Sequence, residues 1–313
     1  MNTNHTHGGC DRDHDGPHVH TNDKIVLRNS FLIVFSFMIV EIVFGVVSNS
    51  LALISDAFHM LSDAAALFLS LAALKISEKK ANLKKTFGYK KIEIIAAFIN
   101  ALALIALAIF VTVEAIIRLF SEPVINANFM LIVSVLGLAV NILVAFYMHK
   151  GADLKGNLNV KGAYLHVLGD ALGSVGAIIA AVAVMKFNFT QADGIASIFV
   201  SVLIAKSGFY LLKDSFNVLI QAVPADLDAA EILRIIKSAG GVISVHDLHI
   251  WAINGRTNAL TAHVTVDKNL KVCEISQMIK RIESELSRVG VDHVTLQFES
   301  LDTGHSDEII CGI

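Results

Sequence analysis

The chain has 313 residues, of which 54% are hydrophobic and 17% charged, and its formal net charge is −3. A mean hydropathy of +0.63 is too high for an ordinary soluble domain, so the composition favours an integral membrane protein. This charge balance shows no strongly basic character, and we expect no nucleic-acid partner.

The first segment, residues 1–24, is polar and rich in histidine and aspartate. It is too polar to fold alone, so we expect a disordered tail. This segment is rich in metal ligands, namely imidazole and carboxylate groups and the thiol of Cys10. It is therefore predicted to capture zinc weakly. The alternative is a tail without a binding role. The histidines concerned are His5, His7, His14, His18 and His20.

Six apolar stretches follow, each close to the roughly 20 residues that cross a bilayer core. They predict a six-helix transmembrane domain over residues 25–215. A polar tail precedes the first stretch and no small-residue cleavage site follows it, so we do not interpret it as a signal peptide. The stretches are 31–47, 51–74, 94–113, 129–148, 163–185 and 195–212.

The connections between these stretches differ in positive charge. Seven lysines lie between the second and third stretches and three between the fourth and fifth, whereas the opposite connections hold only Arg118 and Lys186 at their margins. Positive residues favour the cytoplasmic side, so these two loops and both chain termini are predicted to be cytosolic. The lysines of the longer loop are also expected to meet anionic lipid headgroups.

The strongest functional signal is a repeated His-x-Leu-x-Asp pattern. His59 and Asp63 form one copy in the second apolar stretch, and His166 and Asp170 form the other in the fifth. Residues four apart share one face of a helix, and ionisable groups inside membrane helices usually face a functional cavity. The two helices are predicted to be antiparallel. Facing pairs would offer two nitrogen and two oxygen ligands, a tetrahedral set typical of zinc.

Asp56 precedes His59 by three residues and shares its helix face. We therefore predict that it orients the imidazole or relays a proton. The alternative for a single intramembrane histidine or aspartate is a hydrogen bond between helices. Two copies of the same pattern argue against that alternative for the four predicted ligands.

Three segments together carry a family resemblance: SLALISDAFH at 50–59, FGYKKIE at 87–93 and HVLGD at 166–170. With them the chain, from about residue 24 to 299, resembles the bacterial zinc exporters of the cation diffusion facilitator family. The resemblance implies a homodimeric transporter that moves Zn²⁺ out of the cytosol in exchange for protons, in a bacterial inner membrane. The transport site that it implies consists of His59, Asp63, His166 and Asp170. Some members carry a carboxylate at the first position, so His59 favours zinc and cadmium over manganese.

One metal site of some family members has no counterpart here. Those members bind a further zinc through histidines in the loop between the second and third helices. This loop contains Thr86 and Tyr89 and no histidine. We do not expect a metal there.

Beyond residue 212 the composition becomes that of a small soluble domain, predicted over residues 223–300 and followed by a tail at 301–313. Hydrophobic patterning gives the order αββαβ. The resemblance implies that this cytosolic domain is metallochaperone-like and dimerises. The expected fold is therefore an α-helical membrane protein with a cytosolic α+β domain. The expected elements are a helix at 226–239, strands at 242–253 and 259–267, a helix at 272–288 and a strand at 292–299.

Asn254-Gly255 between the first two of these strands is a strong signal for a two-residue hairpin turn. That turn places His246 opposite His263. It also places His249 and Trp251 on the other face, toward the core, so we expect His249 to pack rather than to bind metal.

The third strand alternates in the same way, with His293 and Glu299 on one face. We therefore predict a second, regulatory metal site in this domain. The alternative is that its histidines are solvated at the surface of the sheet. The candidate ligands are His246, His263, His293 and Glu299.

The chemistry of such ligands predicts metal–proton exchange. Zinc requires neutral imidazole and ionised carboxylate, so protonation and metal binding compete, and a site that opens to two compartments in turn exchanges one for the other. We expect a transporter of Zn²⁺, and of Cd²⁺ and other divalent cations, rather than an enzyme. Two alternatives stay open. An intramembrane metalloenzyme lacks support from a His-Glu-x-x-His pattern, and an exporter of organic cations would line its cavity with aromatic residues.

Overall fold

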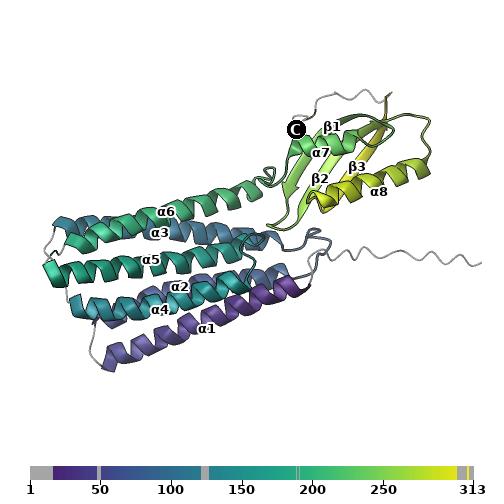
Figure 1. Cartoon of the computed structure of the whole chain (residues 1–313). Helices are drawn as coiled ribbons and strands as arrows, with labels where there is room; N and C mark the ends of the chain where they lie inside the picture. Colours follow the sequence, from purple (N-terminus) through teal and green to yellow (C-terminus); the bar gives the residue numbers. More distant parts are fainter. Residues whose placement is uncertain are drawn as a thin grey trace, which may run out of the picture.

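The computed structural model describes residues 17–47, 51–120, 127–187, 189, 191–301 and 309. Within these ranges the side chains of 17–21, 41, 44–47, 51–59, 62, 118, 127, 129 and 193 are outside the description. Six long helices form a bundle, and a small domain sits at one end of it (Figure 1). The helices are α1 (Pro17–Val47), α2 (Leu51–Ser77), α3 (Lys91–Phe120), α4 (Ala127–Gly151), α5 (Leu158–Phe187) and α6 (Gln191–Leu219).

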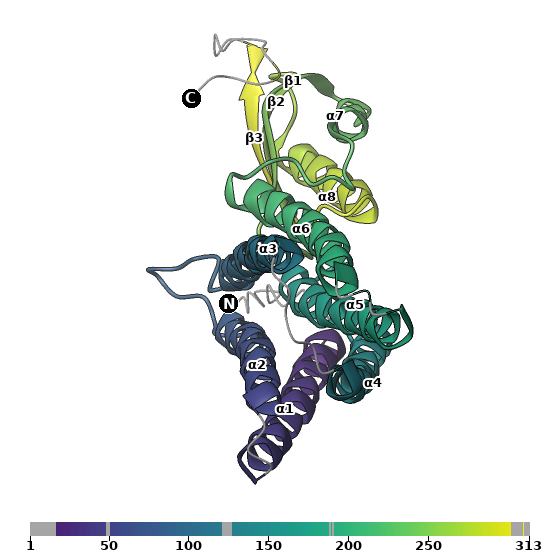
Figure 2. The ribbon, with the colours of Figure 1, turned by 90° about the vertical axis from the view of Figure 1, so that its left-hand side faces the viewer.

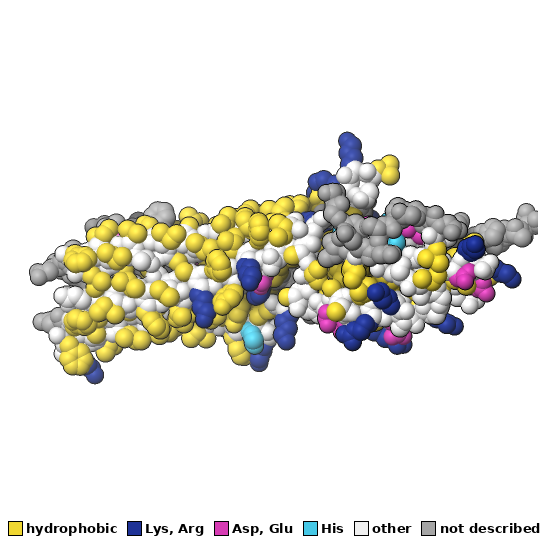
Figure 3. All heavy atoms as spheres, turned by 90° about the horizontal axis from the view of Figure 1, so that it is seen from above, with side chains coloured by type: hydrophobic (Ala, Val, Ile, Leu, Met, Phe, Trp, Pro, Cys, Tyr) yellow, Lys and Arg dark blue, Asp and Glu magenta, His cyan; other side chains and the backbone are white. Residues whose placement is uncertain are grey.

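The outer surface of the bundle is apolar. Figure 3 shows hydrophobic side chains along its length, whereas charged side chains gather toward the end that carries the small domain. Phe110, Ile179 and Phe199 are each more than 60% exposed on this surface. Over their described residues α3, α4, α5 and α6 are long and apolar enough to cross a membrane, and α1 and α2 have comparable lengths of 31 and 27 residues. The predicted helical transmembrane domain is confirmed.

α1 begins at Pro17, inside the range predicted to be a disordered tail. Proline suits the first turn of a helix because the N–H that it lacks would have no partner within the helix. The helix thus extends beyond its apolar stretch and carries Asp23 to the end of the bundle near the small domain. Asp23 is only 1% exposed there.

The helices pack around two apolar cores. One core joins α1, α2, α4 and α5 and includes Leu27 and Leu67, while the other joins α3 and α6 around Ala101 and Leu104. Gly208 of α6 allows a close approach to α3, because a Cβ at this position would lie 3.2 Å from the Leu104 Cβ. Small residues commonly mediate helix contacts in membranes. Figure 2 looks along the bundle and shows the α3–α6 and α4–α5 neighbours side by side.

The C-terminal domain has the predicted order αββαβ. Its three-stranded sheet has the order β1-β2-β3, with β1 and β2 antiparallel and β2 and β3 parallel. Side chains of both helices and of all three strands form one apolar core. The elements are α7 (Ala229–Lys237), β1 (Val242–Ala252), β2 (Asn258–Val266), α8 (Val272–Arg288) and β3 (His293–Ser300).

The β1–β2 hairpin has the predicted pairing of His246 with His263, but its turn differs from the predicted one. The Ile253 N–H donates to the Thr257 carbonyl, so the loop is longer than the predicted two-residue turn. A β-bulge between His246 and His249 removes the resulting displacement, and His246 faces His263 as predicted. Asp247 in the bulge has a φ of 51°, a left-handed conformation that aspartate adopts more readily than most residues.

Because of the bulge, the β1 side chains that follow Asp247 lie on the opposite faces of the sheet from those predicted. A one-residue shift in a strand moves every following side chain to the opposite face. Leu248 and Ile250 therefore lie in the core. The predicted packing of His249 in this core is wrong, because its Nε2 lies 3.0 Å from a carboxylate oxygen of Asp247 instead.

The core of the C-terminal domain can be tested with Leu260, whose side chain is 0% exposed in β2. We expect Leu260→Ala to lower the free energy of unfolding of this domain by about 2–5 kcal/mol, because it leaves a cavity. Trp251 is the only tryptophan in the sequence, so its fluorescence reports this unfolding in the full chain during a urea titration.

Val272→Ala is the matched control, at a position 80% exposed. It should change the free energy of unfolding by no more than about 0.5 kcal/mol. Coincident transitions for Leu260→Ala and the unaltered chain would contradict the core described here.

Candidate metal centre

Helices α2 and α5 bring three of the four predicted transport-site ligands together. The Asp63 Oδ1 lies 3.1 Å from the His166 Nε2. The same nitrogen lies 4.0 Å from the Asp170 Oδ2, one turn further along α5. One ligand atom from each residue lies within 4.8 Å of the other two. This spacing suits a single metal ion bound by nitrogen and oxygen.

His59 and Asp56 belong to α2. Their side chains lie outside the described part of the chain, so their assignments as fourth ligand and as orienting residue or proton relay stay predictions. His59 precedes Asp63 by one helical turn, the spacing that separates His166 from Asp170.

Because the cluster is largely buried, its uncompensated charge determines what it can bind. Asp63 and His166 are 5% and 4% exposed. The Asp170 Oδ2 is also buried and has no hydrogen-bond partner among the described residues. Burying carboxylates with too few hydrogen-bond donors costs free energy. Two carboxylates beside one imidazole therefore form a site that a cation stabilises.

A cavity of about 240 Å³ begins at the Asp63 and Asp170 side chains. Most of its other lining residues belong to the halves of α3, α4 and α6 that are remote from the C-terminal domain. They include Val111 of α3, Val133 of α4 and Ser197 of α6. In this conformation the cavity thus extends from the cluster toward the remote end of the bundle.

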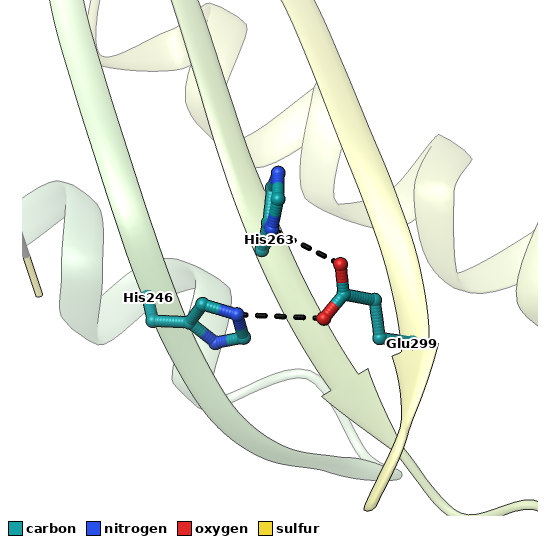
Figure 4. Close-up of side chains that lie close together, drawn as sticks. All are labelled: His246, His263 and Glu299. Atoms are coloured by element: carbon teal, nitrogen blue, oxygen red, sulfur yellow. Dashed lines mark ion pairs between the residues drawn. The ribbon is translucent and has the colours of Figure 1, made fainter. Parts of the chain in front are cut away.

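A second cluster lies on the sheet of the C-terminal domain (Figure 4). Glu299 of β3 places one carboxylate oxygen 3.4 Å from the His246 Nε2 and the other 3.0 Å from the His263 Nδ1. Ligand atoms of the three residues lie within 4.8 Å of one another. His246 and Glu299 are 3% and 8% exposed. Two imidazoles and a carboxylate are again ligands that zinc accepts.

His293, the fourth residue predicted for this cluster, lies elsewhere. It begins β3, whereas Glu299 is near the end of the strand. Its ring contacts the ring of Phe87, from the loop between α2 and α3, with centroids 6.0 Å apart. The prediction that His293 belongs to this cluster is therefore wrong. Alternation along a strand identifies the face on which a residue lies but not its distance from another residue.

Asp247 joins the second cluster although the sequence did not indicate it. Its carboxylate oxygens lie 3.6 Å from the His263 Nε2 and 3.0 Å from the His249 Nε2. A regular strand would direct Asp247 away from this face, and the bulge brings it back. The left-handed backbone that allows this is not visible as a sequence pattern.

The histidines predicted to capture metal near the N-terminus are not tested by this structure. His5, His7 and His14 lie outside the described residues. His18 and His20 fall within α1, but their side chains are not described.

Two sequence families match the two parts of the chain. Residues 27–220 match the cation efflux transmembrane domain. Residues 224–301 match the cation efflux protein, cytoplasmic domain. The boundary between the matches falls at the end of α6, where the bundle gives way to the C-terminal domain.

Curated relatives match nearly the full length. A cadmium, cobalt and zinc/H⁺-K⁺ antiporter of Bacillus velezensis is 45% identical over 298 residues, 95% of each chain. A protein of the same name from Bacillus subtilis is 45% identical over 92% of this chain and 93% of its own. Zinc transporter ZitB of Escherichia coli is 39% identical over 90% of this chain and 91% of its own.

The bundle cluster makes a prediction for metal affinity. In a chain whose second cluster is removed by His246→Ala and His263→Ala, Asp170→Asn should weaken zinc binding by about 100-fold or more. Loss of residues that merely orient metal ligands already costs about 10–100-fold. Competition with a zinc-sensitive dye measures the affinity. Ser197→Ala, at another residue lining the cavity, should stay close to the parent value, and equal affinities for both variants would exclude Asp170 as a ligand.

The second cluster makes a separate prediction for stability. Zinc that binds only the folded domain should raise the urea midpoint reported by Trp251. Glu299→Gln removes a charged ligand at nearly constant volume and should abolish most of this increase. Glu285→Gln changes an exposed glutamate of α8 that pairs with Arg288 and should leave the increase intact. An undiminished increase in Glu299→Gln would place the stabilising zinc elsewhere.

Proposed function

Since the chain belongs to the cation efflux family, a family of membrane transporters, we propose that it exports Zn²⁺ from the cytosol in exchange for protons. The observation that carries this proposal is the largely buried cluster of Asp63, His166 and Asp170, in which two carboxylates share one imidazole beside a cavity. The names of the relatives support both halves of the proposal, because they specify zinc together with H⁺.

Transport follows from competition at the cluster. Zinc binds neutral imidazole and ionised carboxylate, and protons bind the same atoms. With the site open to the cytosol, Zn²⁺ displaces protons onto water. With the site open to the more acidic outer side, protons displace the metal. We assign His59 as the fourth ligand and Asp56 as its orienting partner or as a proton relay.

Metal preference follows from the ligand types. Imidazole nitrogen and carboxylate oxygen in a tetrahedral set suit Zn²⁺ and leave Cd²⁺ and Co²⁺ as further substrates, because such sites select as much by geometry as by affinity. The Bacillus relatives carry all three metals in their names. The lining of the cavity contains no aromatic residue among those described, which favours a metal ion over an organic cation.

We further propose a regulatory zinc in the C-terminal domain. His246, His263 and Glu299 would hold it, since their ligand atoms already converge. A zinc ion there would join β1, β2 and β3, and the protein itself would act as a homodimer assembled through this domain. The N-terminal histidines would raise the local concentration of metal by weak binding.

The orientation that we propose places the C-terminal domain, both termini and both lysine-rich loops in the cytosol of a bacterium, with the bundle in the inner membrane. Two contacts support a common location for these parts. Lys90 of the α2–α3 loop donates to Thr257 of the C-terminal domain at 3.4 Å. Asp153 of the α4–α5 loop accepts from Arg256 of the same domain at 3.0 Å. The lysines there would face anionic lipid headgroups.

Flux measurements in proteoliposomes test the proposal. Zn²⁺ and Cd²⁺ should each drive a proton counterflow through the purified protein, and Mn²⁺ should drive much less. The double variant His59→Ala, Asp63→Ala should abolish the flux, because it removes two of the four proposed ligands. The matched control is His149→Ala in the last turn of α4, which should retain it.

Two results would contradict the proposal. Full flux in the double variant would exclude the cluster as the transport site. An absence of flux with every metal, despite correctly inserted protein, would exclude metal–proton exchange and favour the organic-cation alternative.

A further inference from the structure

An ionic cluster that is buried except at Asp153 joins the C-terminal domain to the helix bundle. Arg256 lies in the β1–β2 loop, and its guanidinium forms ion pairs with Asp23 of α1 and with Asp153 of the α4–α5 loop. The Arg256 and Asp23 side chains are 8% and 1% exposed. We call these three residues the Arg256 clamp.

The clamp is held in a defined geometry. The Asp23 Oδ1 accepts from the backbone N–H of Asp153 at 2.8 Å. Burial raises the pKa of the Asp153 carboxyl, but the Gly156 N–H and the Arg256 guanidinium outweigh burial and hold this pKa below its usual range. Asp153 is therefore ionised at neutral pH, and the arginine stands between two negative charges.

The two loops also touch through their backbones. A Cβ on Gly255 would lie 2.3 Å from the Gly156 carbonyl oxygen, a distance that real side chains do not show. Glycine is thus required at position 255 for this approach. The tip of the β1–β2 hairpin fits directly against the α4–α5 loop.

The clamp continues into the start of α5. The Asn157 Oδ1 accepts from the backbone N–H groups of Asn159 and Val160, which caps the helix. The same side chain donates to the Asp23 Oδ2 at 3.3 Å. Arg256 is therefore linked through Asp23 to the first turn of the helix that carries His166 and Asp170.

A layer of buried hydrogen bonds joins α2, α3 and α5 between the clamp and the metal cluster. Asn159 Nδ2 donates to the Ser70 carbonyl at 2.7 Å, and Asn100 Nδ2 donates to the Ser70 Oγ at 3.0 Å. All three residues are at most 3% exposed. This layer lies about 10 Å along α5 from His166, on the side of the C-terminal domain. The cavity at the cluster extends the other way.

We propose that the Arg256 clamp is a cytosolic gate: it holds the start of α5 against α1 while the transport site faces the outer side, and it must separate before metal loads from the cytosol. The inference rests on the proposed function for its direction. A buried ion pair suits a gate because removing one partner leaves an uncompensated charge, so partial separation is costly. The hairpin that bears Arg256 also bears His246 and His263 on its strands.

Cysteine accessibility tests the gate. The three native cysteines are replaced by serine, and Ser70→Cys is introduced into the buried hydrogen-bonded layer. A membrane-impermeant maleimide is applied from the cytosolic side of inside-out vesicles and, separately, from the outer side of right-side-out vesicles. Arg256→Gln should accelerate labelling from the cytosolic side by about tenfold or more, which corresponds to ~1.4 kcal/mol of gate opening, without accelerating it from the outer side.

Arg288→Gln is the matched control, because Arg288 belongs to the same domain but pairs with Glu285 on the surface. It should label at the parent rate. An unchanged rate in Arg256→Gln would overturn the gate, and so would equal acceleration from both sides, which indicates general loosening. If Arg256→Gln fails to insert, Asp153→Asn carries the same test with the same criteria.

Labelling requires neither metal nor flux, so the two proposals fail separately. Accelerated cytosolic labelling in a protein without zinc flux would retain the gate and reject the proposed substrate. Normal zinc–proton exchange in the unaltered chain with no change in labelling would retain the function and reject the gate.

Discussion

The constraint on which the rest of the structure depends is the cost of placing two carboxylates and an imidazole inside an apolar helix bundle. Asp63 and His166 are buried, Asp170 is partly buried beside them, and the buried Asp170 Oδ2 has only the His166 imidazole, 4.0 Å away, as an ion-pair partner among the described residues. Such a cluster is tolerated when a cation, either a metal ion or a proton, compensates its charge. The uncompensated negative charge raises the free energy of the empty site. It therefore also makes the site selective for cations and responsive to pH. On one side of the cluster a cavity extends between the helices, and on the other side Ser70, Asn100 and Asn159 form a buried hydrogen-bonded layer.

The two apolar cores of the bundle hold different helices, and only one of them contains both helices of the site. The four helices α1, α2, α4 and α5 share one core, and the cluster lies between α2 and α5 within that group. α3 and α6 form a tightly packed pair with its own core, and α6 leads directly into the C-terminal domain. The domain thus has a covalent link to one helix group and an ionic link, through Arg256, to the other. A change in the position of the domain acts on both groups at once.

Much of this architecture is predictable because it depends on local patterns. Continuous apolar stretches predict the bundle, and two His/Asp pairs with helical spacing predict that Asp63 and His166 meet. What depends on contacts between distant segments is not predictable in this way. Alternation in β3 gave the face of His293 but not its position, about 20 Å along the strand from Glu299. The bulge at Asp247 has no sequence signature. Arg256 and Asp23 are 233 positions apart, and no periodicity relates them.

The paired irregularities of the β1–β2 hairpin have a consequence for how this chain can change over generations. A longer loop and a β-bulge each displace the register by one residue, in opposite senses, and His246 faces His263 only because both are present. An insertion or deletion in the loop, or a substitution that abolishes the bulge, would shift the register by one residue. This shift would separate the two histidines and exchange the core-facing and outward-facing side chains of part of the strand. Such changes are inherited without loss only as compensating pairs. Loop length, which drifts freely at most protein surfaces, is therefore tied here to a backbone conformation several residues away.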